Sequence, residues 1–457
     1  MRPALRPSLR RTSLRRTIAA TGLAASVVAA LLSVPASAAG APAPRPRVEV
    51  EIPGPEEGGE AGSGHVRVPA TGASRPAARL SGRAADADGD VSEIVDNGPS
   101  ADRLDVVIVG DGYTVDQLAK FHADAKEKWG EVTGVEPYTT YQNLFNVWTV
   151  DAVSAQSGVS GDPAQGDVKN TALGAYFWCD GIERLLCIDQ DKVDSYVAKA
   201  PQADLVIVLA NSTKYGGAGY NEPSQKLGYE GISTASAGNA KSGQVAIHET
   251  GHSLGKLADE YFYPGTPGYE HYSGPEVAES NISVLSADAM AAQRTKWYRW
   301  LGETSPDGGT VGAYEGGGYY VTGLFRPTDN SIMRILGKPF SLPGREAMIA
   351  GFYRHASIAT AAVPTAQTLR AHDRARVTVP LLAGADVKQP RIRWYLDGRE
   401  LTRFEGRTWV GVAQAIISPW DRRTHQLKVT VTDPTKSVRD PRIAAGLSDS
   451  VTWSVRR

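Results

Sequence analysis

The chain of 457 residues has only two cysteines and four methionines, and it contains no apolar run of the roughly 18 residues that a membrane span needs. So few cysteines exclude a small disulfide-dense scaffold. Charged residues make up 22% and apolar residues 41%, which excludes an intrinsically disordered chain. The stretch 1–38 contains six arginines and no acid. Beyond this stretch acids outnumber bases by 50 to 43, so we expect no nucleic-acid partner.

The stretch 1–38 has the three parts of a secretory signal peptide. Six arginines precede the apolar run Ile18–Leu32, which is too short for a comfortable membrane span. The small residues from Ala36 to Ala38 then form a cleavage site. We therefore expect a secreted protein that begins near Ala39 and leaves the membrane when the signal is removed. An uncleaved anchor is the alternative, and the two arginine pairs leave Sec or twin-arginine export open.

The two cysteines lie close together in the chain, at Cys179 and Cys187. In an oxidising compartment such a pair most simply forms a small-loop disulfide that stabilises the fold by about 2 kcal/mol. A metal-binding pair is the alternative, but it lacks two further thiols or nearby histidines.

The composition along the chain predicts three parts after the signal peptide. Residues 39–100 are rich in Ala, Gly, Pro and acids and are expected to be a linker or a small N-terminal segment with one or two short strands. Residues 101–362 alternate strands with helices, which is typical of a mixed sheet. Residues 363–457 contain at least five short alternating runs, which predict an all-β sandwich of immunoglobulin type with Trp394 in its core.

The segment that carries chemistry begins at His248, Glu249 and His252. On a helix, residues four apart lie on one face, so both imidazoles can bind one ion. Neutral imidazole suits Zn²⁺, and Glu249 is placed to act as general base for a zinc-bound water that attacks a carbonyl. A surface helix with an incidental pattern is the alternative, but the apolar residues Val245–Ile247 favour a helix with one face in the core.

The third metal ligand is predicted from the residues that follow this helix. In the metzincin pattern it would fall at Ala258, which cannot bind zinc. Asp259 and Glu260 come next and carry suitable oxygens; we favour Asp259, and either could instead orient a histidine. Farther along, Met333 is expected to form a methionine turn beneath the metal, or else to be an ordinary core residue.

Several other residues are weaker candidates. Tyr261, Tyr319 and Arg334 could stabilise an oxyanion, although most tyrosines and arginines have no such role. His271 could be a reserve ligand, but it is better explained as a solvated loop histidine. The stretch 228–237, just before the predicted zinc helix, is a candidate edge strand for pairing with an extended substrate.

From His248 to Tyr261 the sequence has the form H-E-x-x-H-x-x-G-x-x-x-D-E-Y and resembles the IgA-peptidase family of zinc metallopeptidases. The stretches 109–114, 179–187 and 314–334 are also similar to that family. The resemblance covers roughly residues 95–360. It implies an α/β (α+β) zincin-like, metzincin-like catalytic domain with a mixed sheet and an active-site helix, but it implies no particular substrate.

The sequence therefore predicts a secreted zinc metalloendopeptidase that acts on proteins or peptides. One alternative is an exported binding protein whose zinc site is structural or vestigial and whose β-sandwich holds the ligand. Another is a metal-dependent hydrolase of non-peptide substrates. The oligomeric state stays open, as does a role of residues 40–100 as a removable pro-segment. No cysteine lies in that stretch, so any inhibition would have to be steric or come from a carboxylate.

Overall fold

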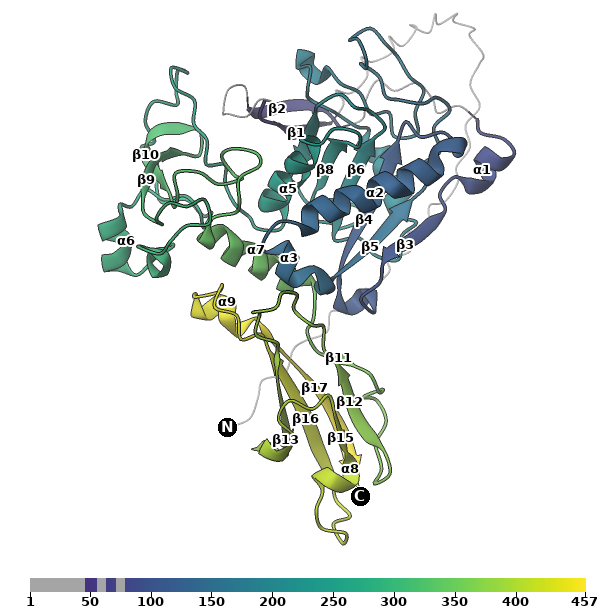
Figure 1. Cartoon of the computed structure of the whole chain (residues 1–457), viewed down its shortest axis with the longest axis vertical. Helices are drawn as coiled ribbons and strands as arrows, with labels where there is room; N and C mark the ends of the chain where they lie inside the picture. The colour runs from purple at the N-terminus through teal and green to yellow at the C-terminus, as the bar shows by residue number, and fades with distance from the viewer. Residues whose placement is uncertain (1–45, 56–62, 71–78) are drawn as a thin grey trace, which may run out of the picture. The chain divides into compact units, whose positions relative to one another are not determined.

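A computed structural model of the chain describes residues 46–55, 63–70 and 79–457 (Figure 1). The predicted signal peptide lies outside these residues. Within the described ranges, no helix combines the length and the apolar character that crossing a bilayer requires.

A mixed sheet of eight strands forms the centre of the larger part, in the order β2-β1-β7-β8-β6-β4-β5-β3. Its strands are β1 (Arg47–Ile52), β2 (Gly64–Pro69), β3 (Val91–Val95), β4 (Leu104–Asp111), β5 (Phe145–Val150), β6 (Leu205–Ala210), β7 (Gly217–Tyr220) and β8 (Ile232–Ser236). The four strands β8, β6, β4 and β5 are parallel, and the strands outside them pair antiparallel. The predicted mixed sheet is therefore confirmed.

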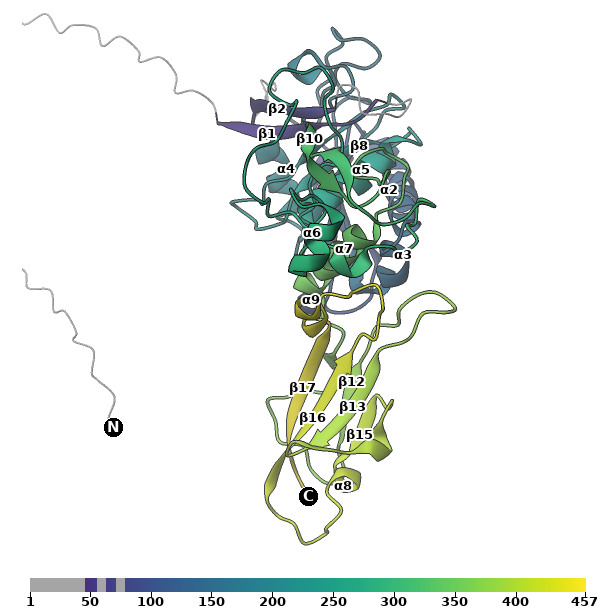
Figure 2. The same cartoon turned by 90° about the vertical axis from the view of Figure 1, so that its left-hand side faces the viewer.

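Helices cover both faces of this sheet, which explains why β4 and β6 are buried along their whole length. On one face lie α2 (Leu118–Thr133), α5 (Ser242–Ser253) and α7 (Leu342–His355), which share a core with β4. On the other face lie α4 (Gln190–Val197) and the long loop before it (Figures 1 and 2). A capping box of Thr114 and Gln117 precedes α2.

Residues 39–100, expected to be a linker or a small N-terminal segment with one or two short strands, contribute β1, β2 and β3 to this sheet. Strands β1 and β2 form an antiparallel hairpin at one edge, while β3 pairs with β5 at the other edge. The sheet therefore begins at Arg47 rather than near residue 101. Local composition did not indicate that β1 joins the central sheet. The strand that connects β1 to this sheet is β7, which comes much later in the chain.

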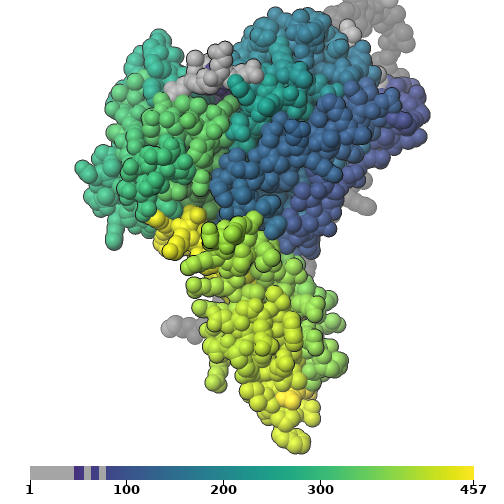
Figure 3. Space-filling view, in the orientation of Figure 1, coloured from purple at the N-terminus to yellow at the C-terminus, as the bar shows by residue number. Residues whose placement is uncertain are grey.

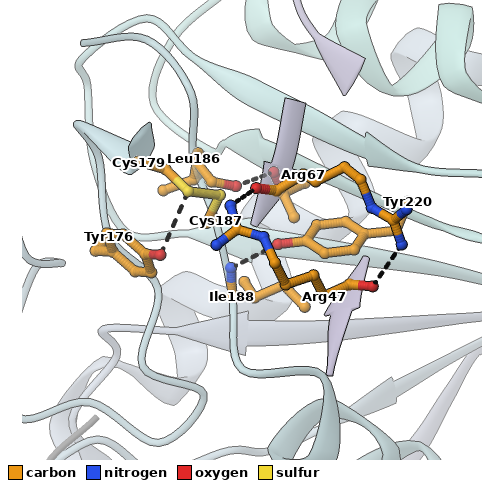
Figure 4. Close-up of a disulfide and its surroundings, with 9 residues drawn as sticks. Arg47, Arg67, Tyr176, Cys179, Leu186, Cys187, Ile188 and Tyr220 are labelled. Carbon is orange, nitrogen blue, oxygen red and sulfur yellow. Dashed lines mark hydrogen bonds between the residues drawn. A yellow bond between two sulfur atoms is a disulfide. The ribbon is translucent and has the colours of Figure 1, made fainter. Parts of the chain in front are cut away.

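The disulfide between Cys179 and Cys187 is present, as predicted (Figure 4). It closes a loop that lies against β7, where Leu186 N–H donates to Gly217 O at 3.1 Å. Ile188 N–H donates to the hydroxyl of Tyr220 at 3.0 Å. The bridge therefore supports the strand next to the β1–β2 hairpin.

A region of loops and short elements follows α5. It contains α6 (Ala287–Gln293), β9 (Tyr314–Gly317) and β10 (Tyr320–Arg326), with a small core of its own around Trp297 and Trp300. The remaining short helices are α1 (Arg83–Ala87), α3 (Tyr138–Tyr141), α8 (Val412–Ala415) and α9 (Pro441–Ala445).

The C-terminal part consists of two antiparallel sheets. One holds β11 (Thr360–Ala361), β12 (Arg374–Thr378) and β15 (Trp409–Gly411), and the other holds β14 (Arg399–Glu400), β13 (Arg391–Leu396), β16 (Thr424–Thr432) and β17 (Ser448–Arg456). Trp394 is fully buried, as predicted, and its ring stacks on Trp453 with 5.9 Å between centroids. The alternating sequence runs thus become strands because one face of each is buried.

The C-terminal sheets contact the larger part through buried polar groups. The carboxylate of Asp433 accepts hydrogen bonds from the hydroxyls of Tyr141 at 2.7 Å and Tyr353 at 3.0 Å. The backbone N–H of Arg439 donates to Glu346, and the segment with α9 lies against the larger part in the space-filling view (Figure 3). The hydrophobic core is continuous across this contact.

Candidate metal site

Helix α5 brings the two predicted imidazoles together. The Nε2 atoms of His248 and His252 lie 3.1 Å apart. Each Nδ1 lies within hydrogen-bond distance of a backbone carbonyl, Ile332 O at 2.8 Å for His248 and Leu257 O at 2.7 Å for His252. In the neutral imidazoles these Nδ1–H groups donate, which orients both rings and leaves both Nε2 lone pairs directed to one point.

Of the two carboxylates that follow the helix, Asp259 faces the imidazoles. Its Oδ1 lies 3.3 Å from Nε2 of His248 and 3.3 Å from Nε2 of His252. Glu260 is turned away, because its carboxylate accepts hydrogen bonds from Asn281 at 2.9 Å and Ser331 at 2.7 Å. This geometry agrees with the preference for Asp259 over Glu260 in the sequence analysis.

A second carboxylate, which the sequence analysis did not anticipate, enters this group from β1. Glu51 Oε1 lies 2.8 Å from Nε2 of His248, and Oε2 lies 3.0 Å from Nε2 of His252. The side chain is only 2% exposed. Two nitrogens and three carboxylate oxygens therefore surround one point.

The spacing of these atoms fits a tetrahedral metal ion. Ligands at about 2.0–2.1 Å from a tetrahedral centre lie about 3.3–3.4 Å from one another. The observed distances between the imidazole nitrogens and Asp259 Oδ1 are 3.1 and 3.3 Å. Among the described residues, no hydrogen bond of good geometry reaches the buried Asp259 Oδ1. Imidazole nitrogen and carboxylate oxygen are both ligands that Zn²⁺ accepts.

The charges in this group shift one another's protonation equilibria. Burial by itself lowers the pKa of His248 and His252, but the adjacent Glu51 and Asp259 raise it well above the usual histidine value. Burial raises the pKa of Glu51, but the two imidazoles outweigh that effect and lower it. The group therefore favours a positive charge at its centre, which a proton or a metal ion can supply.

Glu249 lies beside the metal-binding atoms but is held by other contacts. Its Oε2 accepts a hydrogen bond from Asn221 at 2.9 Å, and its buried Oε1 has no partner among the described residues. Burial, and then the negative charge of Glu51, raise the pKa of Glu249 well above the usual glutamate value. A carboxylate with one free oxygen and a raised pKa suits proton transfer near neutral pH.

Glycine allows close approach of side chains on two sides of α5. A Cβ at Gly219 of β7 would lie 1.8 Å from Oε2 of Glu249. A Cβ at Gly251 would lie 2.4 Å from Sδ of Met333, so Met333 packs directly beneath the helix between its two histidines. Met333 is also buried in the hydrophobic core that α5 shares with the sheet, so the methionine turn stays a prediction beside the alternative of an ordinary core residue.

The three oxyanion candidates have different neighbours. The hydroxyl of Tyr319 donates to Asp259 Oδ2 at 2.7 Å, and that of Tyr261 donates to Glu51 at 3.3 Å. Arg334 donates to the backbone O of Asp329 at 2.6 Å and lines a small cavity together with His248, Glu249 and Tyr261. All three candidates therefore lie at or beside the site.

His271 lies outside the candidate site. It is exposed and lies 3.0 Å from Thr322 Oγ1. It is not among the described residues that could hold a metal ion together, which agrees with the interpretation as a loop histidine.

The proposed substrate edge in residues 228–237 is wrong. Strand β8 (Ile232–Ser236) lies inside the sheet, between β6 and β7. The strand that borders the site is β7, whose sequence, Gly217–Tyr220, has too little apolar character to predict a strand. The segment nevertheless forms strand β7 at the border of the site, because its backbone pairs with that of β8.

Sequence reasoning missed three residues at the site, namely Glu51, His65 and Asn221. Asn221 donates to both Glu249 and Glu51, at 2.9 and 3.2 Å. His65 lies 3.1 Å from the hydroxyl of Tyr319. The only local signal for Glu51 is a charged residue in an alternating strand, which normally indicates an exposed face.

A cleft remains open beside these residues. A cavity of about 370 Å³ is lined by Glu49, His65, Asn221, His252 and Tyr319, among others. A second cavity of about 620 Å³ adjoins it, with the rings of Tyr263 and Tyr269 in its wall. Strand β1 therefore forms one wall of the space next to the imidazoles.

The fold and the site together are those of a metal-dependent hydrolase. A helix packs against an α/β sheet, and its paired histidines and adjacent glutamate face a buried carboxylate. The profile of the IgA Peptidase M64 family matches residues 92–308 and 304–352, more than half of the chain. The chain therefore belongs to this family of metallopeptidases, as the resemblance predicted. No curated protein sequence matches it significantly.

Proposed function

We propose that this protein is a secreted zinc-dependent endopeptidase with His248, His252 and Asp259 as metal ligands and Glu249 as general base. The observation that carries the proposal is the convergence of three ligand atoms at tetrahedral spacing, 3.1 to 3.3 Å apart, next to a carboxylate with a free oxygen. Membership of a metallopeptidase family supports it, and a peptidase acts on protein or peptide substrates.

A bound Zn²⁺ would polarise the scissile carbonyl and make a water molecule more acidic. Glu249 would then accept a proton from that water and deliver it to the leaving amine through its Oε1, which has no partner among the described residues. Asn221 holds the other oxygen of Glu249 in place. Tyr319 holds Asp259 through a hydrogen bond, a contact of the kind that orients metal ligands.

We also propose the cellular location and the parts of the chain. Residues 1–38 act as the signal peptide that exports the protein. Residues 101–362, together with the strands from the preceding segment, form the catalytic domain. Residues 363–457 form a sandwich of immunoglobulin type, supported by two antiparallel sheets around stacked Trp394 and Trp453.

One observation favours a second candidate, an exported binding protein with a structural zinc site. A purely structural site fills all four positions with protein ligands, and Glu51 offers oxygen at the fourth position. The adjacent Glu249 argues against this candidate, because a structural site has no use for a base with a free oxygen.

The test starts from a Glu51→Ala protein, in which no Glu51 oxygen fills the fourth position. It is compared with the Glu51→Ala, Glu249→Gln double variant, using casein and a peptide library with and without phenanthroline. We expect stoichiometric zinc in both, phenanthroline-sensitive hydrolysis by the first, and a loss of about 10²- to 10⁴-fold in the second. Stoichiometric zinc with no hydrolysis by either protein would favour the structural site. Equal hydrolysis by both would remove Glu249 as the base.

A further inference from the structure

Strand β1 lies along the outer edge of β7, at the border of the candidate site. Glu51 and Gly219 form an antiparallel pair in the sheet register. Extended peptides bind to sheet edges in this way, through backbone pairing with side chains that alternate between the two faces. In this chain β1 therefore occupies the position that an extended substrate would take beside α5.

Most polar contacts of the Glu51 carboxylate are made with residues outside its own hairpin. Besides the two imidazoles, Oε1 accepts a hydrogen bond from Tyr261 at 3.3 Å and Oε2 accepts one from Asn221 at 3.2 Å. Nε2 of His65, on β2, lies 3.8 Å from Oε2. A buried carboxylate needs a positive partner, because its transfer out of water is costly. Glu51 is thus suited to bind the same cation as His248 and His252.

The hairpin of β1 and β2 is attached to the catalytic domain by backbone hydrogen bonds and by apolar packing. Arg184 donates to Pro53 O at 2.7 Å, and the hydroxyl of Tyr215 donates to Gly54 O at 2.6 Å. Gln190 N–H donates to Ala70 O at 3.1 Å. These hydrogen bonds hold backbone carbonyls at the two ends of the paired strands, and the buried side chains of Val50, Ile52 and Val68 add apolar packing that keeps β1 in the sheet.

The hairpin lies outside the part of the chain that the family profile matches. The match begins at residue 92 and includes His248, Glu249, His252 and Asp259, whereas Glu51 lies in β1, before residue 92. The residues to which we assign catalysis are therefore complete without it. Glu51 is an addition to that set.

We propose that the paired strands β1 (Arg47–Ile52) and β2 (Gly64–Pro69) form an inhibitory segment, in which Glu51 is a displaceable fourth ligand of the catalytic metal. This inference rests on the proposed zinc-peptidase function. While Glu51 is in place, the carbonyl of a substrate cannot reach the metal, and β1 covers the edge of β7. Movement or removal of the hairpin exposes both at once, with no covalent change in the site itself.

The test measures access to the metal separately from catalysis. The purified protein is loaded with Co²⁺ and titrated with acetohydroxamate, whose binding to an open coordination position changes the visible absorption of the ion. If the site of the unaltered protein is open in about 1% of molecules, it binds hydroxamate about 100-fold more weakly than an open site. We therefore expect Glu51→Ala to bind about 100-fold more tightly, and Glu51→Gln to do so in part.

Arg47→Ala is the matched control. Arg47 is an exposed residue on the same strand and lines neither of the two cavities beside the site. Equal hydroxamate affinity in the unaltered protein and Glu51→Ala, or an equal gain in Arg47→Ala, would overturn the inhibitory role while leaving the peptidase proposal intact. Failure of all these proteins to bind stoichiometric Co²⁺ or Zn²⁺ would overturn both proposals. Thermal melting of each variant checks that it is folded.

Discussion

Two adjacent carboxylates after the active-site helix have opposite orientations. Asp259 faces the imidazoles, with Tyr319 bound to its second oxygen. Glu260 lies in a closed polar environment, and burial raises its pKa to about 7 even though Ser331 and Asn281 donate to it. Two residues that look equivalent in the sequence therefore differ in what they can bind.

This difference predicts the outcome of replacing each carboxylate by its amide. Asp259→Asn should weaken zinc binding by at least about 100-fold, because it removes a charged ligand. Glu260→Gln should leave zinc affinity within a few-fold. It should lower the free energy of unfolding by about 1–3 kcal/mol, because its amide group cannot accept both hydrogen bonds. Chelator competition measures the affinity and urea unfolding measures the stability. A larger loss of zinc affinity in Glu260→Gln would contradict the assignment of ligands.

At the scale of elements, the site depends on how closely β7 approaches α5. The two elements can approach closely because Gly219 has no side chain. The Glu249 carboxylate occupies the space where a Cβ of residue 219 would be. The disulfide loop supports β7 from its outer edge through Gly217. The position of Glu249, the proposed general base, is therefore controlled by a strand that is separate from α5 in the sequence.

We expect Gly219→Ala to displace the Glu249 carboxylate while the histidines keep their metal. In a Glu51→Ala background, kcat should fall by at least about 100-fold, since a misplaced base loses most of its contribution. Zinc content should be unchanged. Gly166→Ala is the control, because a Cβ there meets no atom within 4 Å. Full activity in Gly219→Ala would show that Glu249 has room to adjust.

At the scale of the whole molecule, a charged cluster connects the sheet, the segment before β8 and α7. His355, at the end of α7, lies 3.1 Å from Asp204 and 3.0 Å from Glu230. Burial alone lowers the pKa of His355, but these two carboxylates outweigh it and raise the pKa. Because residues 45–457 form one compact unit, this cluster contributes to the stability of the whole.

The raised pKa predicts how stability depends on pH. The folded protein keeps the proton on His355 to a higher pH than the unfolded chain, whose histidine titrates near pH 6.5. The stabilisation is therefore complete below about pH 6.5 and is lost as the pH rises through the folded-state pKa. Urea unfolding of the unaltered protein and His355→Asn should differ most at low pH and converge at high pH. A difference that does not change with pH would contradict this.

The sequence by itself determined the features that depend on local spacing. Two histidines four residues apart on a helix share a face, so the sequence predicts His248 and His252 as ligands of one metal ion and Glu249 as the adjacent base. Alternating and continuous apolar runs located β4, β6 and β13, since burial on one or both faces leaves that pattern. The disulfide followed from two cysteines with no other partner.

Only the tertiary structure decided which distant residues complete the site. Glu51 and His248 lie 197 residues apart in the chain, and Asn221 and Glu51 lie 170 apart, so no local pattern connects them. Their proximity follows from the pairing of β1 with β7, which depends on backbone hydrogen bonds that any sequence can make. The proposed metal ligands and base were therefore predictable from side-chain spacing on one helix. Access of a substrate to these residues depends on the order of the strands in the sheet, which residue identity alone does not specify.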